Sequence, residues 1–95
     1  MDEKYYVVRT IYAGVFFGQI AERKGDEVTM TNLRRLWSWN GATECCQLAA
    51  EGVSCPADCK FTMVVPQVVI LGVIEIHPCT DKARELLKGV KVWKA

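Results

Sequence analysis

The 95-residue sequence lacks the features that mark secreted, membrane-spanning and nucleic-acid-binding chains. Residues 1–6 contain no basic segment followed by an apolar one, so we expect no secretory signal. The longest apolar run, residues 63–74, is too short to cross a bilayer. Twelve basic residues are spread among eleven acidic ones, which leaves a formal net charge of +1 and no strong signal for nucleic acid. We therefore expect a soluble cytoplasmic protein with no membrane partner.

Motifs of high catalytic specificity are also missing. The glycines within residues 14–25 precede no expected helix, so they do not form a loop that cradles phosphate. Glu75, His77 and Cys79 alternate along one side of an extended segment and are the nearest approach to an acid, a base and a nucleophile. A solvated carboxylate and imidazole at a strand end give the same pattern, and no nucleophile loop accompanies them. We therefore predict no enzyme and no cofactor.

Cysteine is abundant, but its spacing does not define a metal site. The five cysteines are an odd number, which argues against an obligatory disulfide framework, so we expect reduced thiols that pack as small apolar side chains. Paired Cys-x-x-Cys knuckles are absent. The alternative is a zinc-stabilised module with Cys46, Cys55, Cys59 and Cys79 as ligands, in which Cys45 is able to replace Cys46.

The pattern of apolar residues and turns predicts one domain, residues 1–95, with an α+β fold. Expected strands cover residues 5–12, 15–20, 27–31, 33–39, 60–65 and 68–76. Val28 and Met30 point inward, and residues 68–76, apolar on both faces, form a central or interface strand. Expected helices cover residues 44–51 and 81–88, the second capped by Thr80, and residues 90–93 are a strand or a tail. Short connections favour a mostly antiparallel curled sheet or small barrel of five to six strands with two short helices.

Arg35, Trp37 and Trp39 are the candidate ligand-binding residues. They lie two positions apart, so a strand places them on one face. Two indoles beside a guanidinium can stack on a flat ligand such as a nucleobase. They can equally anchor a core or an interface, because Leu36 on the opposite face requires that at least one face be buried. Arg34 is expected to face solvent or an acidic partner.

Segments along nearly the whole chain resemble an uncharacterised family of small bacteriophage and prophage proteins. The segments are Arg34–Ala42, Gln47–Ala49, Cys59–Phe61, Ile74–Thr80 and Val92–Lys94. The resemblance implies a phage or prophage origin and the host cytoplasm as the setting, and it transfers no functional residue.

A weaker likeness concerns architecture. Residues 13–20, the polar turn that follows and residues 28–30 look like the strand-turn-strand opening of Sm-like and SH3-like small barrels. The chain lacks the initial helix and the characteristic Asp and Asn positions of Sm proteins, so no RNA-binding ring follows from the likeness.

Taken with the origin that the resemblance implies, these observations predict a non-enzymatic phage or prophage accessory protein that works by binding. A homo-oligomer is expected, because the apolar strand residues near the chain end exceed what two short helices can cover. One version binds a host protein through the tryptophan-containing face. Another captures a small nucleotide, such as a defence signal, on Trp37 or Trp39, and a third is a structural component of the virion.

Overall fold

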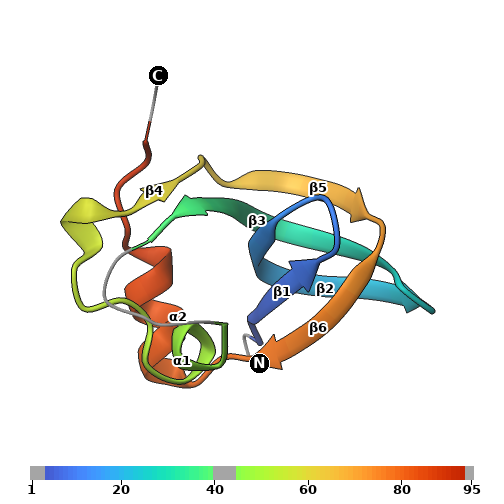
Figure 1. Ribbon diagram of the computed structural model, residues 1–95, viewed down its shortest axis with the longest axis horizontal. Helices are drawn as coiled ribbons and strands as arrows, with labels where there is room; N and C mark the ends of the chain where they lie inside the picture. The colour runs from blue at the N-terminus through green and yellow to red at the C-terminus, as the bar shows by residue number, and fades with distance from the viewer. Residues whose placement is uncertain (1–3, 40–44, 94–95) are drawn as a thin grey trace.

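The computed structural model describes residues 4–39 and 45–93, and residues 40–44 of the motifs above lie outside them. Figure 1 shows a curled sheet with the two helices packed together to one side. The elements are, in chain order, β1 (Tyr6–Thr10), β2 (Val15–Lys24), β3 (Glu27–Ser38), α1 (Cys45–Glu51), a 3-10 turn (Pro56–Asp58), β4 (Lys60–Phe61), β5 (Val65–Ile70), β6 (Val73–Pro78) and α2 (Asp81–Lys88). The predicted α+β class is confirmed.

The sheet is antiparallel and open. Its order is β4-β3-β2-β1-β6, and β5 pairs with β3 on the same edge as β4. β5 lies opposite the first half of β3 and β4 opposite the second half, which the twelve-residue length of β3 allows. Within the described residues β5 pairs with β3 alone and β6 with β1 alone, so no ladder joins the two ends. The curled sheet is therefore confirmed, and the alternative of a small barrel is wrong.

The segment 68–76 differs from the single strand, central or at an interface, that its apolar character predicts. Gly72 has a φ of +74°, a left-handed conformation that suits glycine, and it turns the chain between β5 and β6. β5 also begins earlier than expected and runs through Pro66, which is tolerated because β5 is an edge strand. The segment therefore forms two edge strands rather than one central strand, and its place at an interface stays a prediction.

A bulge at Asn32 decides which side chains of β3 face which layer. Between two paired positions β3 has two residues, Asn32 and Leu33, where β2 has only Gly18. Asn32 takes a φ of +48°, which asparagine tolerates better than most residues. The extra residue reverses the alternation, so that Arg34 faces the helices and Arg35 lies on the opposite face of β3.

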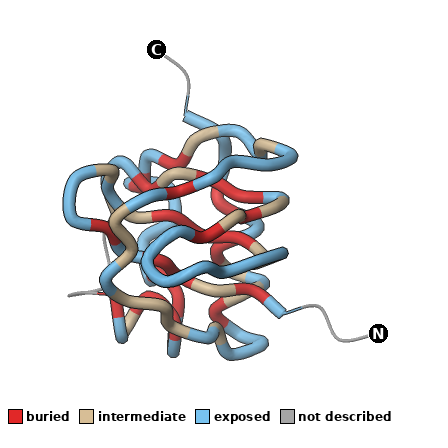
Figure 2. The backbone as a smooth tube through the Cα atoms, turned by 90° about the vertical axis from the view of Figure 1, so that its right-hand side faces the viewer, coloured by how far each residue is buried: buried red, intermediate tan, exposed pale blue. Residues whose placement is uncertain are grey.

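Two apolar clusters fill the two faces of the sheet, and Figure 2 shows buried stretches alternating with exposed ones along the chain. The helix-side cluster contains Tyr5, Val7, Phe17, Leu36, Cys45, Leu48, Ala49, Val53, Cys59, Phe61, Leu87 and Val90. The inner cluster, on the face turned away from the helices, contains Val8, Phe16, Val28, Met30, Leu33 and Ile70. The predicted inward orientation of Val28 and Met30 is confirmed, because both are fully buried.

Arg34 is buried, with 2% of its surface exposed, so the expectation that it faces solvent or an acid is wrong. Its Nε donates to the Thr62 carbonyl at 2.8 Å, and its Nη1 donates to the carbonyls of Leu87 at 3.0 Å and Lys88 at 3.4 Å. Burial lowers the pKa of this guanidinium. The carbonyls in the last turn of a helix have no partner within the helix, so Arg34 satisfies them and ties α2 to β3.

The helices follow the capping chemistry of the sequence. The Thr80 hydroxyl accepts from the Ala83 amide at 3.1 Å and donates to the Ala50 carbonyl at 2.6 Å, so it caps α2 and joins it to α1. After α2, Val92 forms an isolated parallel bridge with Phe61 rather than a strand. None of the helices in the described ranges is long and apolar enough to span a membrane.

Candidate functional site

An apolar groove opens where the inner cluster reaches the surface. It consists of two adjoining hollows that share Phe16, Arg35 and Val68. The larger hollow, about 470 Å³, is also lined by Tyr12, Ala13, Val69, Ile70, Leu71 and Gly72. The smaller hollow, about 200 Å³, is also lined by Leu33, Trp37, Thr62 and Val65. Residues from β2, β3, β5 and the β1–β2 loop therefore converge on one site.

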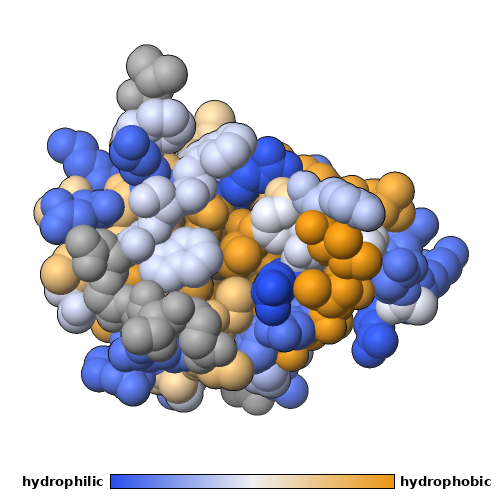
Figure 3. All heavy atoms as spheres, in the orientation of Figure 1, coloured by the Kyte–Doolittle hydropathy of each residue, from blue (hydrophilic) through white to orange (hydrophobic). Residues whose placement is uncertain are grey.

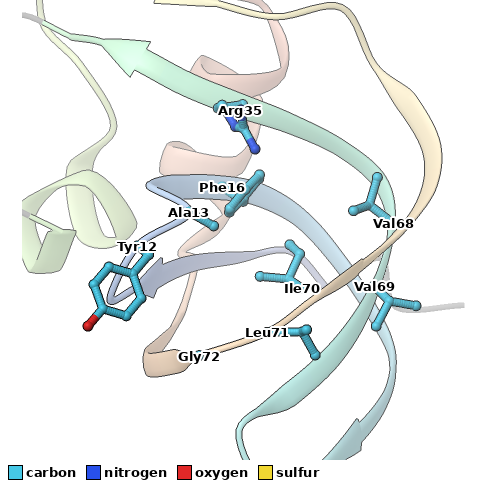
Figure 4. A pocket seen from close by; sticks show the side chains of 9 residues that line it. All are labelled: Tyr12, Ala13, Phe16, Arg35, Val68, Val69, Ile70, Leu71 and Gly72. Carbon is cyan, nitrogen blue, oxygen red and sulfur yellow. The ribbon is translucent and has the colours of Figure 1, made fainter.

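Arg35 is the single charged side chain among the described residues that line this apolar groove. Its guanidinium lies 5.0 Å from the centroid of the Phe16 ring and 5.3 Å from that of Trp37. Figure 4 shows the guanidinium end directed towards Phe16. The backbone of Arg35 is fixed by Thr62, whose hydroxyl accepts from the Arg35 amide at 2.8 Å and whose amide donates to the Arg35 carbonyl at 3.0 Å. A cation is thus held over two aromatic faces.

No acidic side chain pairs with Arg35 among residues 4–39 and 45–93. The neighbouring Arg34 behaves differently, because its guanidinium bonds to carbonyl oxygens on the helix side of β3. A guanidinium with apolar walls and no paired anion attracts a carboxylate or phosphate more strongly than one in open water, because the local dielectric constant is lower.

Exposed apolar side chains surround the groove. Of the residues that line it, Tyr12 is 96% exposed, Leu71 64% and Val69 51%. Figure 3 shows hydrophobic residues gathered on the side of the molecule where β1, β5 and β6 lie. Contiguous apolar surface of this kind is typical of an interaction site in a soluble domain.

The three candidate ligand-binding residues, Arg35, Trp37 and Trp39, do not lie at one site. Arg35 and Trp37 lie together in the groove, where Trp37 is 58% exposed. Trp39 follows the end of β3 and packs instead against the helix-side cluster. It lines a separate recess of about 370 Å³ beside Arg9 and His77. Trp37 and Trp39 therefore cannot stack on the same ligand ring.

The Glu75, His77 and Cys79 pattern is also divided. His77 Nε2 lies 2.7 Å from Glu75 Oε1, so these two meet as their spacing suggests. Cys79 packs against the helix-side cluster, and burial raises its pKa to about 12, which keeps it protonated and unreactive. The thiol that faces His77 belongs to Cys46, whose Sγ lies 3.9 Å from Nδ1. Alternation along one strand could not reveal Cys46, because it comes from α1.

The proposed zinc ligands do not gather. None of the five cysteines forms a disulfide; Cys45 and Cys59 are buried, Cys79 is half-buried, and Cys46 and Cys55 are exposed. In the part of the chain that the structure describes, no three His, Cys, Asp or Glu side chains are placed to hold a metal ion. The set of Cys46, Cys55, Cys59 and Cys79 is therefore not brought together as a metal site.

The fold and the groove define a small α+β domain whose curled antiparallel sheet presents an apolar site on one side. The chain belongs to the family described as Domain of unknown function (DUF6948), whose model matches residues 3–87. No curated protein and no solved structure matches the chain. The family description names no activity, so the groove itself is the basis for a functional proposal.

Proposed function

We propose that this chain is a non-enzymatic accessory protein that binds a partner protein by accepting a hydrophobic segment with an acidic side chain into the apolar groove. The observation that carries the proposal is Arg35, whose guanidinium stands between two aromatic rings without an acidic partner in the described residues. A carboxylate on the incoming segment would complete that pair, and apolar side chains on either side of it would fill the two hollows.

The edge of β5 supports a protein partner. β5 pairs with β3 on one side only, so its other edge offers backbone donors and acceptors to an extended segment. A segment added there would place alternate side chains towards Val68 and Ile70, which border the larger hollow. Main-chain hydrogen bonds would contribute affinity, and Arg35 would select for the acidic side chain.

A nucleotide is the second candidate, favoured by the exposed Trp37 indole beside the guanidinium. The groove supports it less well, because a nucleotide carries several negative charges and Arg35 is the only cation among the groove-lining residues that the structure describes. Saturable quenching by nucleotides that disappears in Trp37→Phe would favour this candidate over the protein partner.

A phage or prophage origin is part of the proposal. Its support is the sequence resemblance over nearly the whole chain, and a host protein is then the natural partner. Co-purification from infected or induced bacteria, compared between the natural protein and Arg35→Gln, would identify a partner that depends on the groove.

The binding experiment selects from a random peptide library against the natural protein and then measures each enriched peptide against Arg35→Gln. We expect enriched peptides to combine apolar residues with Asp or Glu and to bind Arg35→Gln about tenfold more weakly, because one charge-assisted contact is lost. Arg23→Gln is the matched control, since Arg23 is an exposed hairpin arginine that bonds to the Gly25 carbonyl. Peptides without an acid, or equal binding to Arg35→Gln, would refute the proposal, and so would a dimer that occupies the groove.

A further inference from the structure

A second site lies away from the groove, in the recess beside Trp39. Its polar side chains come from three elements: Arg9 from β1, Cys46 from α1, and Glu75 and His77 from β6. Antiparallel pairing of β1 with β6 sets Arg9 directly opposite Glu75. The contacts between α1 and β6 then bring the Cys46 thiol to the same recess.

The four side chains form a continuous chain of polar contacts. Cys46 Sγ lies 3.9 Å from His77 Nδ1, and His77 Nε2 lies 2.7 Å from Glu75 Oε1. The other carboxylate oxygen, Glu75 Oε2, accepts from Arg9 Nη1 at 3.2 Å. The imidazole is therefore held between a thiol and a carboxylate, with one ring nitrogen for each.

A carboxylate on one imidazole nitrogen and a thiol on the other is an arrangement that can activate the thiol as a nucleophile. The hydrogen bond with His77 lowers the pKa of Glu75, and the charge of Arg9 lowers it further, so Glu75 is a carboxylate near neutral pH. A carboxylate beside Nε2 favours the tautomer with its proton on Nε2, which leaves Nδ1 able to accept a proton from the thiol. The remaining titratable group of the recess, Cys45, is buried in the helix-side cluster.

We propose that Cys46 is a nucleophilic thiol that accepts acyl groups, with His77 as its base and Glu75 as the residue that positions the imidazole. His77 Nδ1 takes the thiol proton, and the thiolate attacks the carbonyl carbon of an ester or thioester. The bond from that carbon to the leaving oxygen or sulfur breaks, and His77 returns the proton to the leaving group. The products are a Cys46 thioester and the released alcohol or thiol, so no oxidant or metal is required.

The recess suits a small acyl group. It has a volume of about 370 Å³, and Val15 and Trp39 supply apolar walls beside the exposed thiol. The site is distinct from the groove, since the two share no lining residue. The proposed partner binding and the proposed acyl transfer can therefore fail independently.

The first test measures alkylation of each cysteine by iodoacetamide at pH 6, with the modified sites read by peptide mass spectrometry. Cys55 is the internal control, because it is an exposed thiol whose recorded neighbour is the Ser54 hydroxyl rather than an imidazole. Iodoacetamide reacts with the thiolate, and a thiol without a neighbouring base is almost fully protonated at pH 6. Transfer of the Cys46 proton to His77 would keep a larger fraction of Cys46 as thiolate at this pH. The larger thiolate fraction of Cys46 speeds its alkylation, and the lower nucleophilicity of a more acidic thiolate offsets part of this gain. We therefore expect Cys46 to react roughly tenfold faster than Cys55.

The second test uses p-nitrophenyl acetate as the acyl donor. We expect one equivalent of nitrophenolate and one acetyl group on the peptide that contains Cys46, with neither in Cys46→Ser, which changes one exposed atom and leaves the core intact. His77→Asn should abolish the advantage of Cys46 over Cys55, and Glu75→Gln should reduce it. Equal alkylation of Cys46 and Cys55 at pH 6, an advantage that survives in His77→Asn, or acetylation that persists in Cys46→Ser would overturn the proposal.

Discussion

Replacing Arg34 by methionine tests whether a buried cation holds α2 against the sheet. Methionine keeps an unbranched stem of similar length but removes all three hydrogen bonds to the carbonyls of Thr62, Leu87 and Lys88. The bonds at 2.8 and 3.0 Å are well formed, whereas the bond at 3.4 Å is weak. A hydrogen bond to a charged group contributes about 1.5–3 kcal/mol, and removing the guanidinium also relieves its desolvation cost. The expected loss is therefore about 2–4 kcal/mol.

The assay is unfolding in urea and by heat, followed by circular dichroism. For a domain of this size, each kcal/mol shifts the melting temperature by about 4–8 °C, so Arg34→Met should melt roughly 8–32 °C lower with an unchanged denaturant slope. The melting temperature of Arg34→Lys should lie between those of the natural protein and Arg34→Met, because an ammonium keeps the charge but lacks the several N–H donors of a guanidinium. Arg23→Met is the control for the loss of an exposed arginine. A free energy of unfolding within about 0.5 kcal/mol of the natural protein would refute the reasoning.

Three further predictions follow from single sites. Gly18→Ala should cost about 1–3 kcal/mol of unfolding free energy in urea, because an added Cβ would lie 2.7 Å from the Cα of Leu33; an unchanged midpoint would contradict this. The hydrogen bond with His77 lowers the pKa of Glu75, so the ionised carboxylate stabilises the folded state at pH values above the ordinary carboxyl pKa of about 4.3. This stabilisation is lost as the pH falls through the lowered pKa of Glu75. The melting temperatures of the natural protein and Glu75→Gln should therefore converge as the pH falls below about 4.3, as measured by calorimetry; a constant difference would count against the contact with His77. Cys79 should resist iodoacetamide in the folded protein at about pH 8 and react only after denaturation, because its pKa is about 12.

Local patterns predicted the parts of the fold that short-range chemistry determines. Alternation identified the buried Val28 and Met30, and the sequence Thr80-Asp81 identified the beginning of α2. Both signals depend on neighbours within a few residues, so they are legible in the chain itself. The turn at Gly72 was missed because the apolar residues on both sides of it read as one continuous strand.

The candidate site was predicted only in part for a similar reason. Arg35 and Trp37 are two residues apart on β3, so strand geometry alone brings them together. Trp39 has the same spacing but lies beyond the end of β3, where the alternation no longer applies. Cys46 meets His77 through the packing of α1 on the sheet, a contact between residues 31 positions apart that no local pattern specifies.

The bulge at Asn32 also bears on how relatives of this chain should be compared. If a relative kept all of these residues but paired without the bulge, the strand beyond it would turn over, and the first arginine of the pair would face the groove while the second faced α2. An alignment scored by residue identity would count both arginines as retained, although the two would have exchanged the faces of β3 on which they lie. A relative one residue shorter at this point would instead keep each arginine on its own face, because the deletion removes only the residue that the bulge adds. Members of the family should therefore be grouped by whether this segment can form the bulge before their binding is compared.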